Sequence, residues 1–152
     1  MLRQLFSILR GIFKEDSKKD ILLPTSDRRI GFVGLTMFLS KLCPNDSLFL
    51  GDRDFLLCSK SDIQEFLSQD KTNRREYVTE KFDCEDFAFR LMGQFSIYPW
   101  SDLAFGIVWT ELHALNCFVD ENEVFWFVEP QTDEILTALK PWMGTEIRFI
   151  TM

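Results

Sequence analysis

The sequence lacks three patterns that would each indicate a defined class of protein. None of its four cysteines stands in a C-x-x-C pair, which argues against a structural zinc site. The formal net charge is −7 and no basic stripe is present, so nucleic acid is not an expected partner. No apolar run is long enough to span a bilayer, and no internal repeat or low-complexity tract occurs. We therefore expect no transmembrane segment.

The composition predicts a single domain with a substantial core. The chain has 152 residues, 46% of them hydrophobic, and 16 of them are phenylalanine. A chain of this size can fold without the disulfides on which small secreted domains depend. We expect reduced cysteines in a cytoplasmic protein, with Cys43, Cys58 and Cys117 packed as small hydrophobes and Cys84 reactive.

Residues 1–20 form an N-terminal segment that differs from the remaining residues, 21–152. Its apolar residues recur at helical spacing between basic ones, which predicts an amphipathic helix. Arg10 and Gly11 interrupt the apolar run and no small-x-small cleavage site follows, so we expect no signal peptide. Docking of this helix on its own domain, a partner or a dimer mate is favoured over lying on a membrane surface.

Hydrophobic periodicity and turn residues predict helices first and strands after them. This order is typical of an α+β domain with a C-terminal antiparallel sheet. Ser61 and Gln64 have the spacing of a capping box, and Gly93 that of a C-cap. The predicted helices cover residues 33–42, 61–68 and 84–92, and the predicted strands residues 55–58, 103–109, 112–119, 124–129 and 146–151.

Three residues of the later half carry the candidate chemistry. Cys84 stands at the predicted first turn of a helix, where unpaired N–H groups and the helix dipole stabilise a thiolate. His113 is the only histidine, and Glu129 ends a neighbouring predicted strand. Taken singly, each also fits a structural role as a buried thiol, a core imidazole or a surface carboxylate. Together they predict a nucleophile, a general base and an orienting carboxylate.

The hairpin between the two strands tests this prediction through its register. A three-residue loop that ends with a left-handed Asn122 would place His113 directly opposite Glu129. A loop of even length would place them on opposite faces, so the triad requires an odd loop. No glutamine stands just ahead of Cys84, and we expect Gln131 or Tyr77 to assist its backbone N–H in binding an oxyanion.

Three segments carry a resemblance to a known family, namely Phe82–Ala88, His113–Asn116 and Trp126–Asp133. They resemble the papain-like cysteine protease domain of the fairy-ring mushroom agglutinin, which is joined there to a ricin-B-type lectin. The similarity spans residues 55–136 and rests on the order of Cys, His and Glu-Pro-Gln. Small stand-alone relatives occur in bacteria and tailed phages, and this chain is more similar to those because it has no lectin repeats.

The resemblance implies a papain-like cysteine protease fold for residues 21–152, with the nucleophile helix packed on the sheet. It also implies a phage-associated or bacterial location and the triad roles given above. The family protease is calcium-activated, so calcium is an implied cofactor. Its implied ligands are Glu85 and Asp86, with Asp83 and Asp133 as further oxygen donors.

The sequence and the resemblance thus predict a thiol-dependent peptide-bond hydrolase acting on a peptide or protein substrate. Two alternatives use the same triad, a cell-wall amidase and a transglutaminase-like acyl transferase. A third is a non-catalytic module that binds calcium or a partner on a degenerate protease fold. In that case Cys84 would react with iodoacetamide no faster than the other three cysteines.

Overall fold

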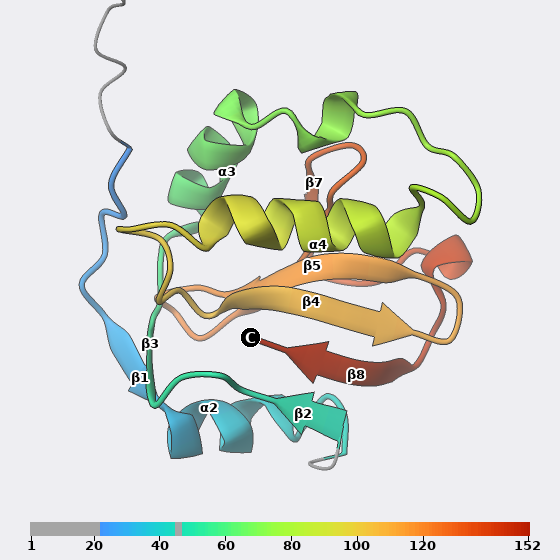
Figure 1. The fold of residues 1–152 in the computed structure, drawn as a ribbon. Helices are drawn as coiled ribbons and strands as arrows, with labels where there is room; N and C mark the ends of the chain where they lie inside the picture. The colour runs from blue at the N-terminus through green and yellow to red at the C-terminus, as the bar shows by residue number, and fades with distance from the viewer. Residues whose placement is uncertain (1–21, 45–46) are drawn as a thin grey trace, which may run out of the picture.

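The computed structural model describes residues 22–44 and 47–152, and the predicted N-terminal helix lies outside them. The elements, labelled as in Figure 1, are β1 (Arg29–Gly31), α2 (Phe32–Leu39), β2 (Leu48–Phe49), β3 (Asp54–Leu56), α3 (Lys60–Gln69), the 3-10 helix η2 (Thr72–Arg74), α4 (Cys84–Phe95), β4 (Phe105–Thr110), β5 (Ala114–Val119), β6 (Phe125–Glu129), β7 (Glu134–Leu136), the 3-10 helix η3 (Pro141–Met143) and β8 (Ile147–Thr151). Among the described residues, no helix is long and apolar enough to cross a membrane.

Six strands form the main sheet in the order β2-β8-β4-β5-β6-β7. β2 runs parallel to β8, and every other pair of neighbours is antiparallel. β1 and β3 form a separate antiparallel pair beside it. β8, although last along the chain, therefore lies inside the sheet between β2 and β4 (Figure 1).

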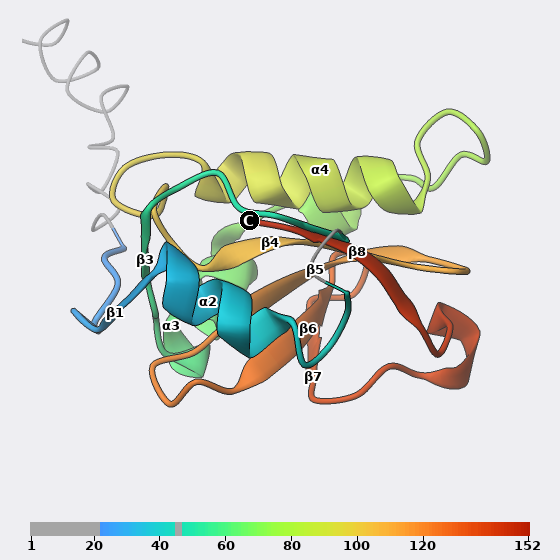
Figure 2. The ribbon, with the colours of Figure 1, turned by 90° about the horizontal axis from the view of Figure 1, so that it is seen from below.

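Helices cover both faces of the main sheet, with α4 on one side and α2 on the other (Figure 2). Side chains of β5 alternate between the two faces. Leu115 and Cys117 pack in the core beneath α2, whereas Phe118 packs in the core beneath α3 and α4. Because both faces are covered, every residue of β5 is buried.

The predicted α+β order, with helices first and an antiparallel sheet after them, was wrong. Strands occur throughout the chain, and β2 makes the main sheet mixed. The sequence did not indicate β1 and β2 because they have only 3 and 2 residues, too few to show an alternating pattern. β7, also 3 residues long, was missed for the same reason.

Two helix ends also differ from the prediction. The cap of α3 is Ser59 and not Ser61, because the Ser59 hydroxyl accepts the Asp62 N–H at 3.1 Å and Asp62 accepts the Ser59 N–H. Gly93 lies inside α4 and not at its end, and the helix continues to Phe95 with Ser96 as C-cap. Packing of the last turn against the core extends the helix beyond the glycine, since Phe95 is buried.

Asn116 and Gly106 fix α4 against the sheet. The fully buried Asn116 amide donates to the carbonyls of Ala88 in α4 and Gly106 in β4, both at 3.0 Å. A Cβ on Gly106 would lie 1.8 Å from the carbonyl oxygen of Thr151, so this position has room only for glycine. The start of α4 is thereby held over β4 and β5.

Candidate thiol site

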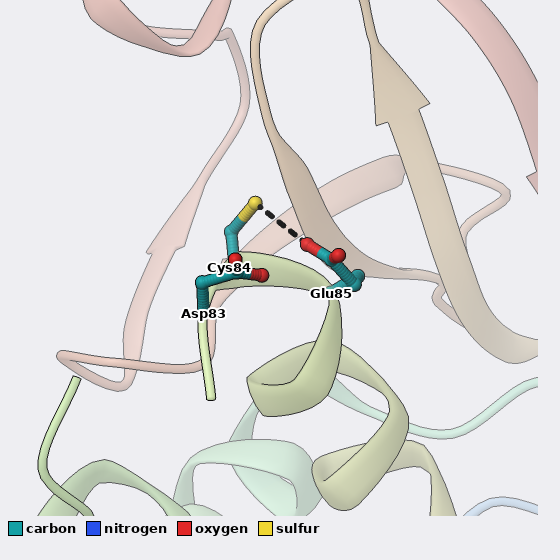
Figure 3. A group of neighbouring side chains, drawn as sticks. All are labelled: Asp83, Cys84 and Glu85. Carbon is teal, nitrogen blue, oxygen red and sulfur yellow. Dashed lines mark hydrogen bonds between the residues drawn. The ribbon is translucent and has the colours of Figure 1, made fainter. Parts of the chain in front are cut away.

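Cys84 is the first residue of α4, as predicted. The helix begins here because the Asp86 carboxylate accepts the N–H of Asp83, the residue ahead of the first turn, at 3.2 Å. The Cys84 side chain is half-buried, and its thiol donates to Glu85 Oε2 at 3.4 Å (Figure 3). The other three cysteines are buried, and none of them forms a disulfide within the described residues.

The surroundings of Cys84 raise the pKa of its thiol above the ordinary value. Burial raises its pKa most, and the backbone N–H of Ala114 opposes this by stabilising the thiolate. The hydrogen bond to Glu85 and the charges of Glu85 and Asp83 raise the pKa further. Ala114 is the first residue of β5 and follows His113 in the sequence.

His113 and Glu129 form a buried pair. His113 Nε2 lies 2.7 Å from Glu129 Oε2, and the two side chains are 7% and 2% exposed. The second carboxylate oxygen, Oε1, accepts the backbone N–H of Gln131 at 3.2 Å. A carboxylate can only accept, so Nε2 carries the proton in this contact, and in a neutral imidazole Nδ1 is then an acceptor.

The predicted contact between these residues is present, but by a different register. Val119 pairs with Phe125, so the β5–β6 loop has five residues instead of three. The loop length is odd, which keeps His113 and Glu129 on one face, and Glu129 is a diagonal neighbour rather than a directly opposite one. The left-handed residue is Glu123, with φ of 58°, and not Asn122.

Trp142 is part of the site, although the sequence did not indicate it. Its ring packs edge-on against the His113 imidazole, with centroids 5.0 Å apart, and half of the residue remains exposed. The short helix η3 brings it there from a distant part of the chain. A tryptophan in a 3-residue helix carries no local signal of this role.

The two oxyanion candidates have different positions. The Tyr77 ring stacks on Phe87 of α4 with centroids 6.5 Å apart. Partial desolvation raises the pKa of the Tyr77 phenol, as do the nearby Asp83 carboxylate and Cys84 thiol, which keeps the phenol a donor near the sulfur. Gln131 contributes its backbone N–H to Glu129, so its observed contact holds the carboxylate in place.

The residues near the thiol do not suit calcium. The ligand atoms of Asp83, Cys84 and Glu85 lie within 4.8 Å of one another (Figure 3). Calcium takes 6–8 oxygen ligands, roughly, and here it would meet two carboxylates and a soft sulfur. Asp86, an implied ligand, instead caps α4. Calcium binding by Glu85 and Asp86 therefore stays a prediction.

Comparisons with known proteins identify the fold. No protein-family model matches the chain, and no curated protein sequence matches it. A solved structure described as the PSL1a–E64 complex matches with a TM-score of 0.70 and 19% identity, covering 82% of this chain and 50% of that one. Polyporus squamosus lectin bound to the human-type influenza-binding epitope Neu5Acα2-6Galβ1-4GlcNAc matches with a TM-score of 0.66 and 18% identity, covering 82% and 49%.

The likeness shows the fold, and this chain spans about half the length of the structures it matches. The second of them is a lectin holding a glycan. The predictions of a papain-like fold, of a thiol-dependent peptide-bond hydrolase and of a peptide substrate are therefore contradicted. Sequence similarity in three short segments could not distinguish a papain-like fold from the fold shared with the lectin, because the similarity did not extend over the whole chain.

Proposed function

We propose that this chain is a thiol-dependent enzyme in which Cys84 attacks the carbonyl carbon of an ester. One observation carries the proposal, the buried contact of 2.7 Å between His113 and Glu129, with the backbone N–H of the next residue, Ala114, acting on Cys84. A buried imidazole held by a carboxylate has a fixed orientation and tautomer, which a purely structural histidine does not require. An ester is favoured as the acyl donor because its leaving group needs less protonation than an amine.

The reaction begins with a proton transfer, because the resting thiol is protonated. His113 Nδ1 takes the proton from Cys84 Sγ as the sulfur bonds to the acyl carbon. The carbonyl oxygen becomes an oxyanion, which the Cys84 N–H and the Tyr77 hydroxyl stabilise. The bond to the leaving oxygen then breaks, and this oxygen receives the proton from the imidazolium. The acyl group remains on sulfur until a second nucleophile accepts it.

Each residue has one role in this scheme. Cys84 is the nucleophile, and His113 is the base and then the acid. Glu129 keeps the proton on Nε2 so that Nδ1 can act, and the Gln131 N–H keeps Glu129 in place. Trp142 shields the pair from water, which strengthens the contact between imidazole and carboxylate.

A burst assay with p-nitrophenyl acetate tests the proposal. Wild-type protein should release one equivalent of nitrophenol rapidly and carry an acetyl group on Cys84, detected by mass spectrometry. Cys84→Ala should give no burst, and His113→Ala should slow acylation by roughly 10²–10⁴-fold. Cys58→Ala, which removes a buried thiol, is the control that keeps the burst. Acetylation that is equal in wild type and His113→Ala would refute the proposal.

A second candidate function is carbohydrate binding. It is favoured by the glycan that the matched lectin holds. In this chain a groove of about 830 Å³ lies beside η3, with Pro141, Thr145 and Arg148 among its lining residues, and Trp142 stands exposed next to it. Exposed aromatic rings next to polar groups suit the mixed apolar and polar faces of sugars.

Titration with Neu5Acα2-6Galβ1-4GlcNAc, followed by NMR of the labelled protein, tests carbohydrate binding. Shifts confined to residues of the groove, and lost in Arg148→Ala but kept in Cys84→Ala, would support it. An absence of shifts with this glycan and with its unsialylated disaccharide would reject it. The two assays are independent, so either function can fail without the other.

A further inference from the structure

A basic pocket of about 340 Å³ lies between α4 and the segment that joins η2 to this helix. Figure 1 shows this segment, in green, running from η2 past the N-terminal end of α4 before it turns back into the helix. The segment contributes Arg75, Glu76 and Phe82 to the lining of the pocket, and α4 contributes Arg90. None of these residues lines the groove beside η3, so the pocket is separate from that groove.

Backbone hydrogen bonds and ring packing hold the walls of this pocket in place. The Arg75 N–H donates to the Thr72 carbonyl at 3.1 Å, which fixes Arg75 at the end of η2. The Phe82 N–H donates to the Val78 carbonyl at 2.8 Å, and the Val78 N–H donates to the Phe82 carbonyl at 2.9 Å. The Phe82 ring packs edge-on against Phe87, a buried residue of α4, with centroids 4.8 Å apart. The pocket is therefore formed before a ligand arrives, which lowers the entropic cost of binding.

The two arginines of the pocket carry positive charge that has no partner within the described residues. No ion pair there includes Arg75 or Arg90, although Glu76 lines the same pocket. The Arg90 Nε atom is buried and has no hydrogen-bond partner among these residues. Buried polar groups are nearly always paired in native proteins, so this nitrogen indicates that the Arg90 side chain lacks an acceptor. Residues 71–82 also carry four basic and two acidic side chains, in a chain whose net charge is −7.

We propose that this pocket binds a carboxylate whose stem is apolar. A guanidinium is a planar fork of donors that matches the two oxygens of a carboxylate, and Arg75 and Arg90 supply two of them. The Phe82 ring supplies an apolar wall on which the stem of the ligand lies. A phosphate without such a stem would leave this wall uncovered. The local surplus of positive charge attracts the anion to this part of an otherwise acidic protein.

The pocket lies along the segment that leads to Cys84. Phe82 stands two residues ahead of Cys84, and Tyr77 belongs to the same segment. A carboxylate that accepts from both Arg75 and Arg90 would therefore restrain this segment against α4. The inference itself concerns binding and does not depend on the reaction proposed for Cys84. Cys84→Ala should bind the carboxylate as wild type does, so either proposal can fail without the other.

Titration of the full isotope-labelled chain with phenylacetate, followed by NMR, tests the proposal. At constant ionic strength the N–H signals of the pocket residues should shift and saturate with phenylacetate, and should not move with phenylacetamide, its neutral analogue. Arg75→Gln and Arg90→Gln should each weaken binding at least about tenfold, because each removes charge-assisted hydrogen bonds. Arg148→Gln, which loses an exposed ion pair with Glu146, is the matched control and should bind phenylacetate as wild type does.

Phe82→Ala tests the apolar wall of the pocket. Wild-type protein should bind phenylacetate more tightly than acetate, because the ring of the ligand is buried against Phe82. Phe82→Ala should lower this preference and leave the affinity for acetate unchanged. Circular dichroism verifies that each variant folds, and Arg75 is exposed, so Arg75→Gln keeps the test decisive if Arg90→Gln does not fold. Equal shifts with phenylacetamide, equal affinity for inorganic phosphate and phenylacetate, or full binding in Arg75→Gln would overturn the proposal.

Discussion

Removal of the Glu129 carboxylate should separate the stability of the site from its chemistry. In Glu129→Ala the N–H groups of His113 and Gln131 lose their acceptors in a region where both side chains of the His113–Glu129 pair are at most 7% exposed. Two buried donors without partners, at about 1–3 kcal/mol each, give an expected loss of roughly 3–5 kcal/mol in the free energy of unfolding. For a domain of this size that lowers Tm by about 6–20 °C.

Glu129→Gln should behave differently because it keeps the volume of the side chain. The glutamine carbonyl can accept one N–H, and its amide can donate to Nε2 if the proton of His113 moves to Nδ1. We expect a stability loss of only about 1–2 kcal/mol. The base nitrogen would then be protonated, so acylation of Cys84 should fall as far as it does in His113→Ala.

Urea unfolding and the nitrophenol burst, measured on the same samples, provide the assay. Glu134→Gln is the matched control, because Glu134 forms an exposed ion pair with Lys140 and should change stability by at most about 0.5 kcal/mol. A Glu129→Gln protein with full acylation would refute the assigned tautomer. A Glu129→Ala protein within about 1 kcal/mol of wild type would refute the burial argument.

Three further predictions follow from individual contacts. Glu85→Gln removes a negative charge that raises the pKa of the Cys84 thiol, so iodoacetamide should alkylate Cys84 faster at neutral pH. Mass spectrometry with Glu76→Gln as the control measures the rate, and equal rates in the two variants would contradict the prediction. Gly106→Ala should lower the free energy of unfolding by more than about 2 kcal/mol, because the new Cβ meets the Thr151 carbonyl. Gly93→Ala should raise it by about 0.5–1 kcal/mol, because Gly93 lies inside α4 and its new Cβ meets nothing within 4 Å. Urea unfolding of both compares them, and similar values would count against the close contact. Hydrogen bonds from the backbone N–H groups of Thr145 and Glu146 lower the pKa of Glu111 to about 2. The ionised Glu111 carboxylate therefore stabilises the fold fully above its unfolded pKa of about 4.3, and this stabilisation is lost as the pH falls through about 2. Glu111→Gln should flatten this acid limb of the stability curve, and an unchanged limb would show that these hydrogen bonds do not matter.

Periodicity and capping residues located the long elements, including α4 and the strands β4, β5, β6 and β8. The position of Cys84 at a helix start followed from local chemistry, because the acidic residues around it suit a helix N-terminus. The pairing of His113 with Glu129 followed from the alternation of side chains along the strands. The predicted loop was two residues too short, but a shift of two residues keeps both side chains on the same face. Trp142 could not be predicted, since only the path of the chain after β7 brings it to the imidazole.

The fold class could not be obtained from the same reasoning. β2 consists of Leu48 and Phe49 and exists only because β8 offers it a partner. A pairing of this kind depends on segments a hundred residues apart, and no local pattern records it. The likeness to part of a lectin is a likeness of the whole fold, and three short sequence segments are not enough to predict it.

The position of β8 has a consequence for synthesis on the ribosome. Residues 147–151 leave the exit tunnel after β2 and β4, yet they fill the space between these two strands. Before β8 pairs with it, β4 has an open strand edge in the nascent chain, and Ile107 and Trp109 belong to this edge. Open edges of this kind pair with other chains, so yield in the cell should depend on chaperones that hold this intermediate and on how soon β8 is synthesised.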